Sequence, residues 1–443
     1  MSKNYATVNP CVMCMPMGSV LAFRGIENTM PMFHGSQGCS TYIRLHLAHH
    51  FREPIDIASS ALSERGAVYG GTDNLKMGLK NVIEGYNPRI IGVATTCLAE
   101  TIGEDVPGII SEFRQEEGMA DDITIIPVST PSYRGSHEEG YNETLKAIVQ
   151  SLASPALPNE KLNLVIGAIV SPADIRYLKQ MLDELNCNRI LLPDFSDTFD
   201  APLVENNPKM PAGGTPIDDV KDMANSSETL SLGICTQAAS AGGYLENTFN
   251  IPHTRLPLPI GLEYTDMFAW KLEEITGQQL PGKYESERGR LLDTMVDVHK
   301  YVAHVKICVF GDTDTVLGIT KLVSEIGMDP VVIASGTHNP VFAEAVKNIT
   351  PGSTILHGCD FTDIHREIKN HDVELMLGPF TGRQISMKEN IPLIRVGLPN
   401  HDRVGAARQL VVGYEGAARL VDTITNTLLE LEDKNKTVTE LII

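Results

Sequence analysis

The sequence predicts an α/β protein with three Rossmann-like domains, each a mostly parallel sheet flanked by helices. Three observations predict this fold. Short apolar runs alternate with amphipathic helical stretches along most of the chain. Turn and capping residues separate these segments, as expected at strand and helix ends. The 443 residues also exceed what a single hydrophobic core supports, so two or three domains are expected.

The first set of elements lies before residue 157. Residues 74–86 carry apolar side chains on one helical face, and Asn87, followed by proline, ends this helix. Residues 90–94 form a buried strand, and Cys97 comes just after it, before a helical stretch that starts near Glu104. Parallel sheets hold ligands at the carboxyl ends of their strands, so this position favours a functional cysteine.

The second set repeats the pattern. The pattern predicts a strand over residues 164–170, and Ser171, followed by proline, is predicted to cap a helix over 175–185. Residues 189–192 form the next strand. The segment 204–227 is rich in Pro, Gly, Asn and Asp, which predicts a surface excursion and not a domain boundary.

The third set has the same rhythm of strands and helices. Its strands are predicted over residues 305–310, 331–334, 374–377 and 393–396, and a helix over 313–326 ends at Gly327. A long helix over 286–303 leads into this set, and another over about 414–431 closes the chain. The chain is therefore expected to divide into domains 1–157, 158–302 and 303–443.

Composition excludes several classes of function. The formal net charge is −20 and no basic tract is present, so nucleic acid would be repelled. No apolar run reaches the length that spans a membrane, and the N-terminus lacks the pattern of a secretory signal. Eight cysteines in a chain of this length are too few for a disulfide scaffold. We expect a cytoplasmic location.

Three cysteines in the first hundred residues are the strongest functional signal. Cys14, Cys39 and Cys97 each lie among glycine, proline or small polar residues, which let the backbone approach a bulky inorganic group. An iron–sulfur cluster needs three or four converging thiolates. Three thiolates from one chain leave such a cluster incomplete, so we expect a partner chain to supply the rest.

Other interpretations of these residues stay open. The glycine-rich cysteine loops could be tight turns with buried thiols, although three such loops in one region favour a cluster. Cys11 and Cys14 could form half of a zinc site with His46, His49 and His50. We favour the alternative that these histidines line a solvated or partner-facing helix end. A catalytic Cys–His pair is conceivable, but nothing marks one cysteine as a lone nucleophile.

The remaining cysteines give weaker signals. Cys187, Cys235 and Cys308 lie in or beside apolar segments and are expected to be inert core residues. Cys359 follows His-Gly in a loop, where the sequence suggests no partner.

Nucleotide binding is not expected. The segment 277–284 imitates a phosphate loop but carries Tyr284 where Ser or Thr must reach the magnesium ion. The segment 311–314 follows a strand but lacks the three glycines that admit a pyrophosphate.

Longer motifs then point to a family. They are the three cysteine segments, His50-Phe-Arg-Glu-Pro54, Thr130-Pro-Ser-Tyr-Arg-Gly-Ser-His137, Gly311-Asp-Thr-Asp314, Pro392-Leu-Ile-Arg-Val-Gly-Leu-Pro399 and Gly413-Tyr-Glu-Gly-Ala417. In this order, over nearly the whole chain, they resemble the β-subunit of nitrogenase component 1. The resemblance implies a homologous α-like partner, in a heterotetramer of two α-like and two β-like chains.

The resemblance also implies roles for individual residues. Cys14, Cys39 and Cys97 match the β-side thiolates of the eight-iron P-cluster, which is shared with the partner chain. Cys39 matches the ligand whose sulfur bridges the two halves of that cluster. Ser132 matches a serine that binds iron in the oxidised cluster.

Two aromatic residues gain roles in the same way. Tyr42 matches an aromatic residue near the cluster on the route of the electrons. Tyr69 matches one at the docking face for a separate, ATP-hydrolysing iron–sulfur reductase. Cys11 has no counterpart among the ligands.

The implied function is the relay of electrons to a metal cofactor in the partner, for reduction of dinitrogen or an organic sulfur substrate. The alternative is the β-like half of a scaffold that assembles the cofactor, with a four-iron cluster and no turnover. That scaffold half often lacks the first and third cysteines, so Cys14, Cys97 and Ser132 favour a catalytic component.

Two further features bear on the branch of the family. Only 13 residues precede Cys14, which favours a shorter relative, such as a methylthio-alkane reductase or an early-branching nitrogenase. Ser36 favours the molybdenum-type and scaffold branches.

Overall fold

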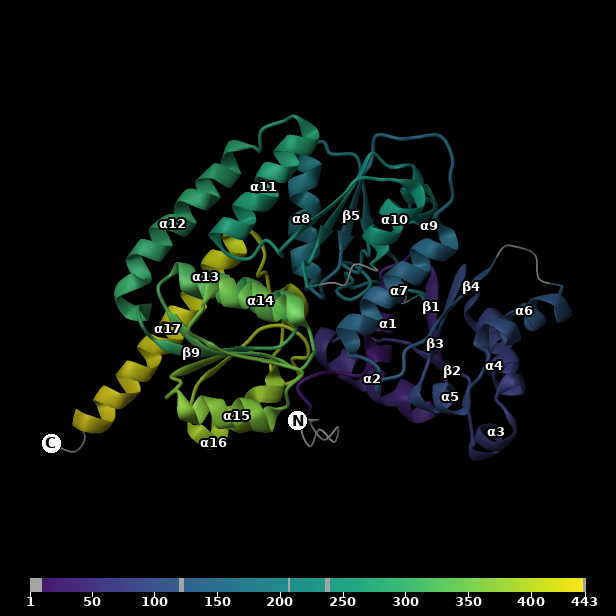
Figure 1. Ribbon diagram of the computed structural model, residues 1–443, viewed down its shortest axis with the longest axis horizontal. Coiled ribbons are helices and arrows are strands. Elements are labelled where there is room, and N and C mark those ends of the chain that lie inside the picture. Colours follow the sequence, from purple (N-terminus) through teal and green to yellow (C-terminus); the bar gives the residue numbers. More distant parts are fainter. Residues whose placement is uncertain (1–9, 119–122, 206–207, 236–239, 441–443) are drawn as a thin grey trace.

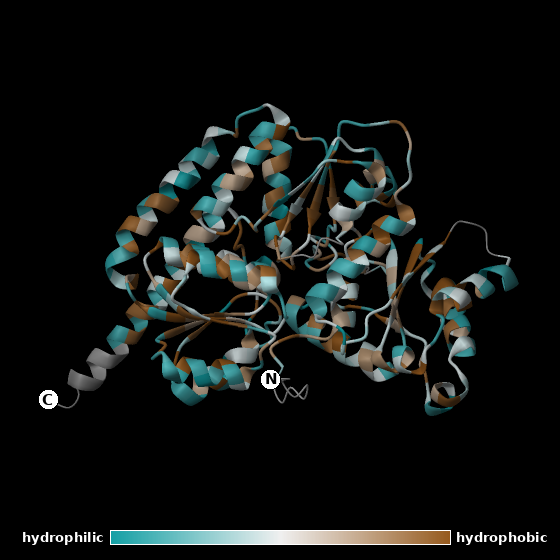
Figure 2. Ribbon diagram, in the orientation of Figure 1, coloured by the Kyte–Doolittle hydropathy of each residue, from teal (hydrophilic) through white to brown (hydrophobic). Residues whose placement is uncertain are grey.

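Three parallel sheets, each flanked by helices, form the chain and confirm the predicted fold class (Figure 1). The computed structural model describes residues 10–118, 123–205, 208–235 and 240–440. The strands are mostly apolar, whereas hydrophilic residues mark the outer helices (Figure 2). Within these residues, no helix combines the length and the apolar character needed to cross a bilayer.

The first sheet has the strand order β2-β1-β3-β4. Its strands are β1 (Thr29–His34), β2 (Ala58–Ser59), β3 (Ile90–Thr95) and β4 (Thr124–Val128). Its helices are α1 (Met15–Arg24), α2 (Gln37–Phe51), α3 (Glu64–Tyr69), α4 (Thr72–Tyr86), α5 (Cys97–Ile102), α6 (Val106–Glu116) and α7 (His137–Leu152). Helices α1 and α7 cover one face, and α4 and α6 pack on the other. His34 pairs with Thr95, so β1 and β3 end at the same level.

The structure corrects the prediction around Cys97. Cys97 is the first residue of the short helix α5 and does not lie in a loop before a helix near Glu104. The next helix, α6, begins only at Val106, where Asp105 caps it. A hydrogen bond from the end of β3 stabilises the short helix α5: the Thr95 hydroxyl donates to the Glu100 carboxylate across 2.5 Å.

The second sheet has the order β6-β5-β7-β8. Its strands are β5 (Leu162–Ile166), β6 (Arg189–Leu192), β7 (Glu228–Leu232) and β8 (His253–Leu256). Its helices are α8 (Pro172–Glu184), α9 (Ile217–Asp222), α10 (Ala241–Phe249) and α11 (Leu262–Thr276), with a 3₁₀ turn over Met223–Asn225. The predicted surface excursion 204–227 is therefore wrong for its second half. Ile217 and Val220 are buried on α9, because tertiary packing overrides the turn-rich composition.

The third sheet has the order β11-β10-β9-β12-β13. Its strands are β9 (Lys306–Phe310), β10 (Asp329–Ser335), β11 (Thr354–His357), β12 (Leu375–Gly378) and β13 (Leu393–Arg395). Its helices are α13 (Thr313–Glu325), α14 (Pro340–Ile349), α15 (Phe361–Asn370) and α16 (Arg383–Glu389), with 3₁₀ turns over Phe380–Gly382 and Ala406–Arg408. The long helices α12 (Gly282–Val302) and α17 (Gly413–Glu440) run side by side (Figure 1). The domain limits near 157 and 302 stay predictions.

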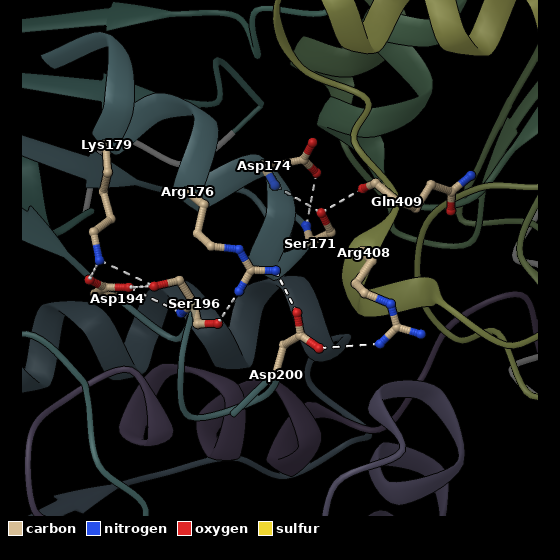
Figure 3. Close-up of polar contacts among 9 residues, drawn as sticks. All are labelled: Ser171, Asp174, Arg176, Lys179, Asp194, Ser196, Asp200, Arg408 and Gln409. Carbon is tan, nitrogen blue, oxygen red and sulfur yellow. Dashed lines mark hydrogen bonds and ion pairs between the residues drawn. The ribbon is translucent and has the colours of Figure 1, made fainter. Parts of the chain in front are cut away.

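The start of α8 ties the second sheet to the segment before α17 (Figure 3). The Ser171 hydroxyl donates to the backbone carbonyl of Gln409 across 2.7 Å. The Asp174 carboxylate accepts the backbone N–H groups of Val411 and Val412 at 2.7 and 3.1 Å. Beside them, Asp200 accepts from the guanidinium groups of both Arg176 and Arg408. These contacts tie the second sheet to the segment that leads from the third sheet into α17.

Candidate metal-cluster site

Close packing between α1 and α7 positions Cys14. An added Cβ at Gly18 would lie 1.8 Å from the His137 carbonyl oxygen, and one at Gly140 would lie 2.0 Å from that of Met15. Only glycine therefore permits this approach of the two helix backbones. Cys14 is the N-cap residue of α1, so the contact fixes where its side chain starts.

The residues just before α7 hold the Cys14 backbone. The Ser136 and Cys14 backbones form an isolated antiparallel bridge. The His137 backbone N–H donates to the Met13 carbonyl across 3.1 Å. The segment that carries Cys14 therefore lies against the segment that carries Ser132.

Cys39 lies in the first turn of α2, directly after β1. Ser36 is the N-cap of this helix and accepts the backbone N–H of Gly38 at 3.3 Å. An added Cβ at Gly35 would lie 1.9 Å from the Thr96 hydroxyl oxygen. The loop before Cys39 therefore touches the residue before Cys97, and a larger side chain than glycine at position 35 would separate them.

A buried histidine fixes the start of the Cys39 loop. His34 Nδ1 lies 3.0 Å from the Ser60 hydroxyl, and its Nε2 lies 3.6 Å from the Glu104 carboxylate. Burial lowers the pKa of His34, and Glu104 partly opposes that effect. Glu104 also accepts the backbone N–H of Gly71 at 2.6 Å. These contacts connect the ends of β1 and α5.

Threonines at the ends of β3 and β4 position Cys97 and Ser132. The Thr130 backbone N–H donates to the Thr95 hydroxyl at 2.9 Å, and the Thr130 hydroxyl donates to the Thr95 carbonyl at 2.7 Å. Two residues further along each segment, the Ser132 backbone N–H donates to Cys97 Sγ at 3.3 Å. The threonine pair thus sets the distance between Cys97 and Ser132.

The three thiols are neighbours at one edge of the first sheet. Burial raises the pKa of Cys39, and the nearby Cys14 and Cys97 thiols raise it further. Cys14 is exposed, and the other two are partly exposed. In the described ranges, no three His, Cys, Asp or Glu side chains are placed to surround a single metal ion. The donor set is soft and widely spaced, which suits one side of a larger metal–sulfur cluster.

The helix directions favour a negatively charged group at this edge. Cys14 caps α1, Cys39 lies in the first turn of α2, and Cys97 begins α5. Helix N-termini carry partial positive charge and unpaired N–H groups. They therefore favour the negative charge of a cluster bound at this edge.

Exposed aromatic side chains surround the same edge. Tyr42, one turn after Cys39, is 67% exposed, and Tyr133, next to Ser132, is 68% exposed. Large apolar groups left in solvent beside open thiols indicate a surface that another chain covers. Tyr69 is 82% exposed on α3, which packs beside α5.

The other cysteines lie elsewhere. Cys11 packs against the core of the third sheet, and burial followed by the nearby Cys359 raises its pKa well above the usual value. Cys359, for which the sequence suggested no partner, donates from Sγ to the Ser335 carbonyl at 3.3 Å. Cys235 and Cys308 are buried, as expected. Cys187 is partly exposed after α8, although it still packs against the core.

Sequence reasoning missed the residues that support the site. The His34–Glu104 and Thr95–Thr130 contacts join segments that are far apart in the chain. One signal could have found them: His34 and Thr95 are polar residues at the carboxyl ends of otherwise apolar strands. The histidines near residue 50 also have an unpredicted neighbour, because the rings of His46 and His49 lie 5.0 and 5.5 Å from that of His401.

Comparison with known proteins gives a consistent result. The sequence model of the family described as nitrogenase component 1 type oxidoreductase matches residues 14–429. The chain is 41% identical to the nitrogenase molybdenum-iron protein beta chain of Methanococcus maripaludis, over 96% of this chain and 95% of the relative. It is 38% identical to the beta chain of the same name from Clostridium pasteurianum, covering 96% and 93%. A solved structure described as nitrogenase Cp1 at pH 6.5 superposes with a TM-score of 0.93 and 36% identity, covering 98% and 96%.

Proposed function

This chain belongs to the nitrogenase component 1 family of oxidoreductases, and on that premise we propose that it relays electrons through a shared P-cluster. It is a β-like subunit of a nitrogenase-type complex, with an α-like subunit as its partner. The family implies iron–sulfur clusters. The proposal assigns one half of an eight-iron centre to this chain.

The observation that carries the proposal is the approach of three thiols at one open edge of the first sheet. Cys14, Cys39 and Cys97 would hold this chain's half of the cluster, and the partner's residues would hold the other half. When bound, the cluster supplies iron sites that accept and release electrons. The Ser132 N–H bond to Cys97 Sγ withdraws charge from that sulfur, which is one way in which a protein tunes a cluster's potential.

Ser132 has the best placement for a second role. Its backbone is fixed beside Cys97, and it lies in a turn that the Arg134 N–H closes on the Pro131 carbonyl at 2.9 Å. A serine hydroxyl held next to a cluster ligand offers an oxygen donor that, once deprotonated, favours a more oxidised iron. We assign Ser132 this role.

The proposed electron acceptor and donor are both other chains. The relatives are named molybdenum-iron beta chains, so we assign the reduction of dinitrogen at a molybdenum–iron cofactor in the α-like partner. The proposed donor is a separate ATP-hydrolysing iron–sulfur reductase. The surface of α3 suits its docking, because Val68 and Tyr69 are 75% and 82% exposed beside α5. We place this exchange in the cytoplasm, whose reducing conditions keep the thiols free.

The heterotetrameric complex tests the proposal. Anaerobically purified complex should contain an eight-iron centre for each αβ pair in addition to the cofactor's iron. With the reductase and ATP it should form ammonia. About four iron atoms per pair, with cofactor transfer to a second protein and no ammonia, would support the assembly scaffold instead. Hydrocarbon release from methylthio-alkanes, without ammonia, would reassign the substrate.

A further inference from the structure

A cavity of about 490 Å³ lies where the second and third sheets face helix α7. Its wall includes residues 167–169 after β5, 313–314 after β9 and 337–341 after β10. In the second sheet, the strand that follows β5 in sequence, β6, lies on one side of β5, whereas β7 and β8 lie on the other side. The direction in which successive strands are added therefore reverses between β5 and β7. Parallel α/β sheets bind small molecules outside the carboxyl ends of their strands at such a reversal.

Two fixed carboxylates line this cavity. Glu138, in the first turn of α7, accepts from the backbone N–H and the hydroxyl of Thr313 at 2.8 and 2.7 Å, and also from the Thr337 hydroxyl. Asp314 accepts the backbone N–H groups of residues 234–235 at 2.8 and 3.1 Å. Burial raises the pKa of Glu138 to about 7 and that of Asp314 to about 6. Hydroxyl and backbone N–H groups hold both carboxylates in position, and no cationic side chain takes part in these bonds.

The lining as a whole has an excess of acidic groups. Glu139 and Glu143 join the two carboxylates, and Arg134, Lys146 and the imidazole of His338 also line the cavity. Arg134 lies 3.5 Å from Glu143, so these two charges largely offset one another. A ligand with positive charge would therefore relieve the burial of the Glu138 and Asp314 carboxylates, and an anion would be repelled by them.

The volume of the cavity and the apolar part of its wall narrow the choice of ligand. Met15, Ile169 and Val341 present aliphatic surface to the cavity. A cavity of this volume is much larger than a single ion needs, and within the described part of the chain no three potential ligands surround a metal position. The lining thus suits a flexible molecule with a short aliphatic stretch and an ammonium group at its end.

We propose that this cavity binds a small aliphatic di- or polyamine, with an ammonium group on Glu138 and Asp314. The methylene chain lies along Met15 and Ile169. None of the proposed cluster ligands lines the cavity, so the inference does not depend on the electron relay.

Calorimetric titration of the anaerobic complex tests the proposal, with putrescine and spermidine as cationic probes and succinate as an anionic control. Spermidine should bind once per β-like chain, and succinate should not bind. The heat should differ between two buffers of different ionisation enthalpy near neutral pH, because binding displaces a proton from Glu138. The double variant Glu138→Gln/Asp314→Asn should bind about tenfold or more weakly. Glu112→Gln, an exposed carboxylate on α6, is the matched control and should bind normally.

A second variant keeps the test decisive if the double variant does not fold. Lys146→Glu adds a carboxylate to the cavity lining, so it should tighten spermidine binding. Three results would overturn the proposal: no binding of either amine to the wild-type complex, binding of succinate in their place, or unchanged affinity in a folded Glu138→Gln/Asp314→Asn variant. Unchanged affinity in Lys146→Glu would overturn it as well.

Discussion

The backbone N–H of Ser132 donates to the sulfur of Cys97 across 3.3 Å, and this bond joins the loop after β4 to the first residue of α5. It depends on the threonine pair two residues earlier, where Thr130 and Thr95 exchange two hydrogen bonds. Cys97 and Ser132, which we propose as cluster-binding residues, are therefore positioned by strand ends and not by a flexible loop.

Cys39→Ala should lower the iron content of the purified complex and remove the redox signals of the proposed cluster. A lost thiolate leaves an iron without its ligand at a site where neighbouring thiols already surround Cys39. Iron analysis and anaerobic spectroscopy would measure this. Cys187→Ala is the matched control, because Cys187 lies at a turn of the second sheet, and it should keep all its iron. A Cys39→Ala complex with full iron content and unchanged spectra would refute the ligand assignment.

Gly18→Ala should destabilise the chain by about 1–3 kcal/mol, because its Cβ would meet the His137 carbonyl at 1.8 Å and push α1 away from α7. Urea unfolding measures the change. Gly85→Ala, near the end of α4, has nothing within 4 Å of the added Cβ and should stabilise the chain by about 0.5–1 kcal/mol. Equal effects at both positions would contradict the close contact of α1 with α7.

Glu64→Lys should slow electron delivery by the reductase and change its salt dependence, while the iron content stays normal. Glu64 begins α3 and is exposed on the proposed docking surface. Reversing a charge at the rim of an interface acts mainly on association. Reductase-dependent turnover at several salt concentrations would show it. Asp218→Lys on α9, which lies far from α3 in Figure 1, should leave turnover unchanged. Identical kinetics in the two variants would exclude α3 from the docking surface.

His50 should make the folded chain less stable as the pH falls. Burial lowers its pKa to about 3, whereas an unfolded histidine titrates near 6.5. Between these values the unfolded chain binds the additional proton, so stability is complete above pH 6.5 and decreases by about 1.4 kcal/mol for each pH unit below it. Burial lowers the pKa of the neighbouring His401 to about 4, which acts in the same direction.

Urea midpoints of the wild type and His50→Gln between about pH 7 and pH 4 would measure the His50 contribution. Comparing the two proteins isolates the His50 contribution, which Glu138 and Asp314 oppose in both of them. Because their pKa values are raised, these two carboxyl groups stabilise the folded chain as pH falls below about 7 and 6. His50→Gln should show a flatter loss of stability than the wild type. Parallel curves would show that His50 does not carry this pH dependence.

Local signals predicted the elements that local contacts determine. Ser171 and Asp174 form a capping box at the start of α8; the sequence identified Ser171 as the cap but predicted the helix only from 175, three residues after its observed start at Pro172. Helix α9 was missed because its segment is rich in turn residues and becomes helical only when Ile217 and Val220 pack into the core. Composition alone carries no information about that packing.

The candidate site likewise combines residues that local signals predicted with contacts that depend on the tertiary fold. The sequence predicted Cys14, Cys39 and Cys97 as ligands, but it is the pairing of β1 with β3 that brings the loops of the last two together. Glu138 and Thr313 are 175 residues apart, so their contact depends on how the first and third sheets meet. The segment 311–314, which lacks the glycines of a nucleotide motif and belongs to the motifs of the family resemblance, supplies Asp314 to the cavity and Asp312 to an ion pair with His137.

The exposed side of Cys14 has a consequence for how the complex is made. A newly synthesised chain without its partner would present three neighbouring thiols at an open edge, and exposure to an oxidant would convert them to sulfenic acids or disulfides. Pairing with the α-like chain would cover that edge before or while iron is inserted. Balanced synthesis of the two chains would then protect these thiols during assembly.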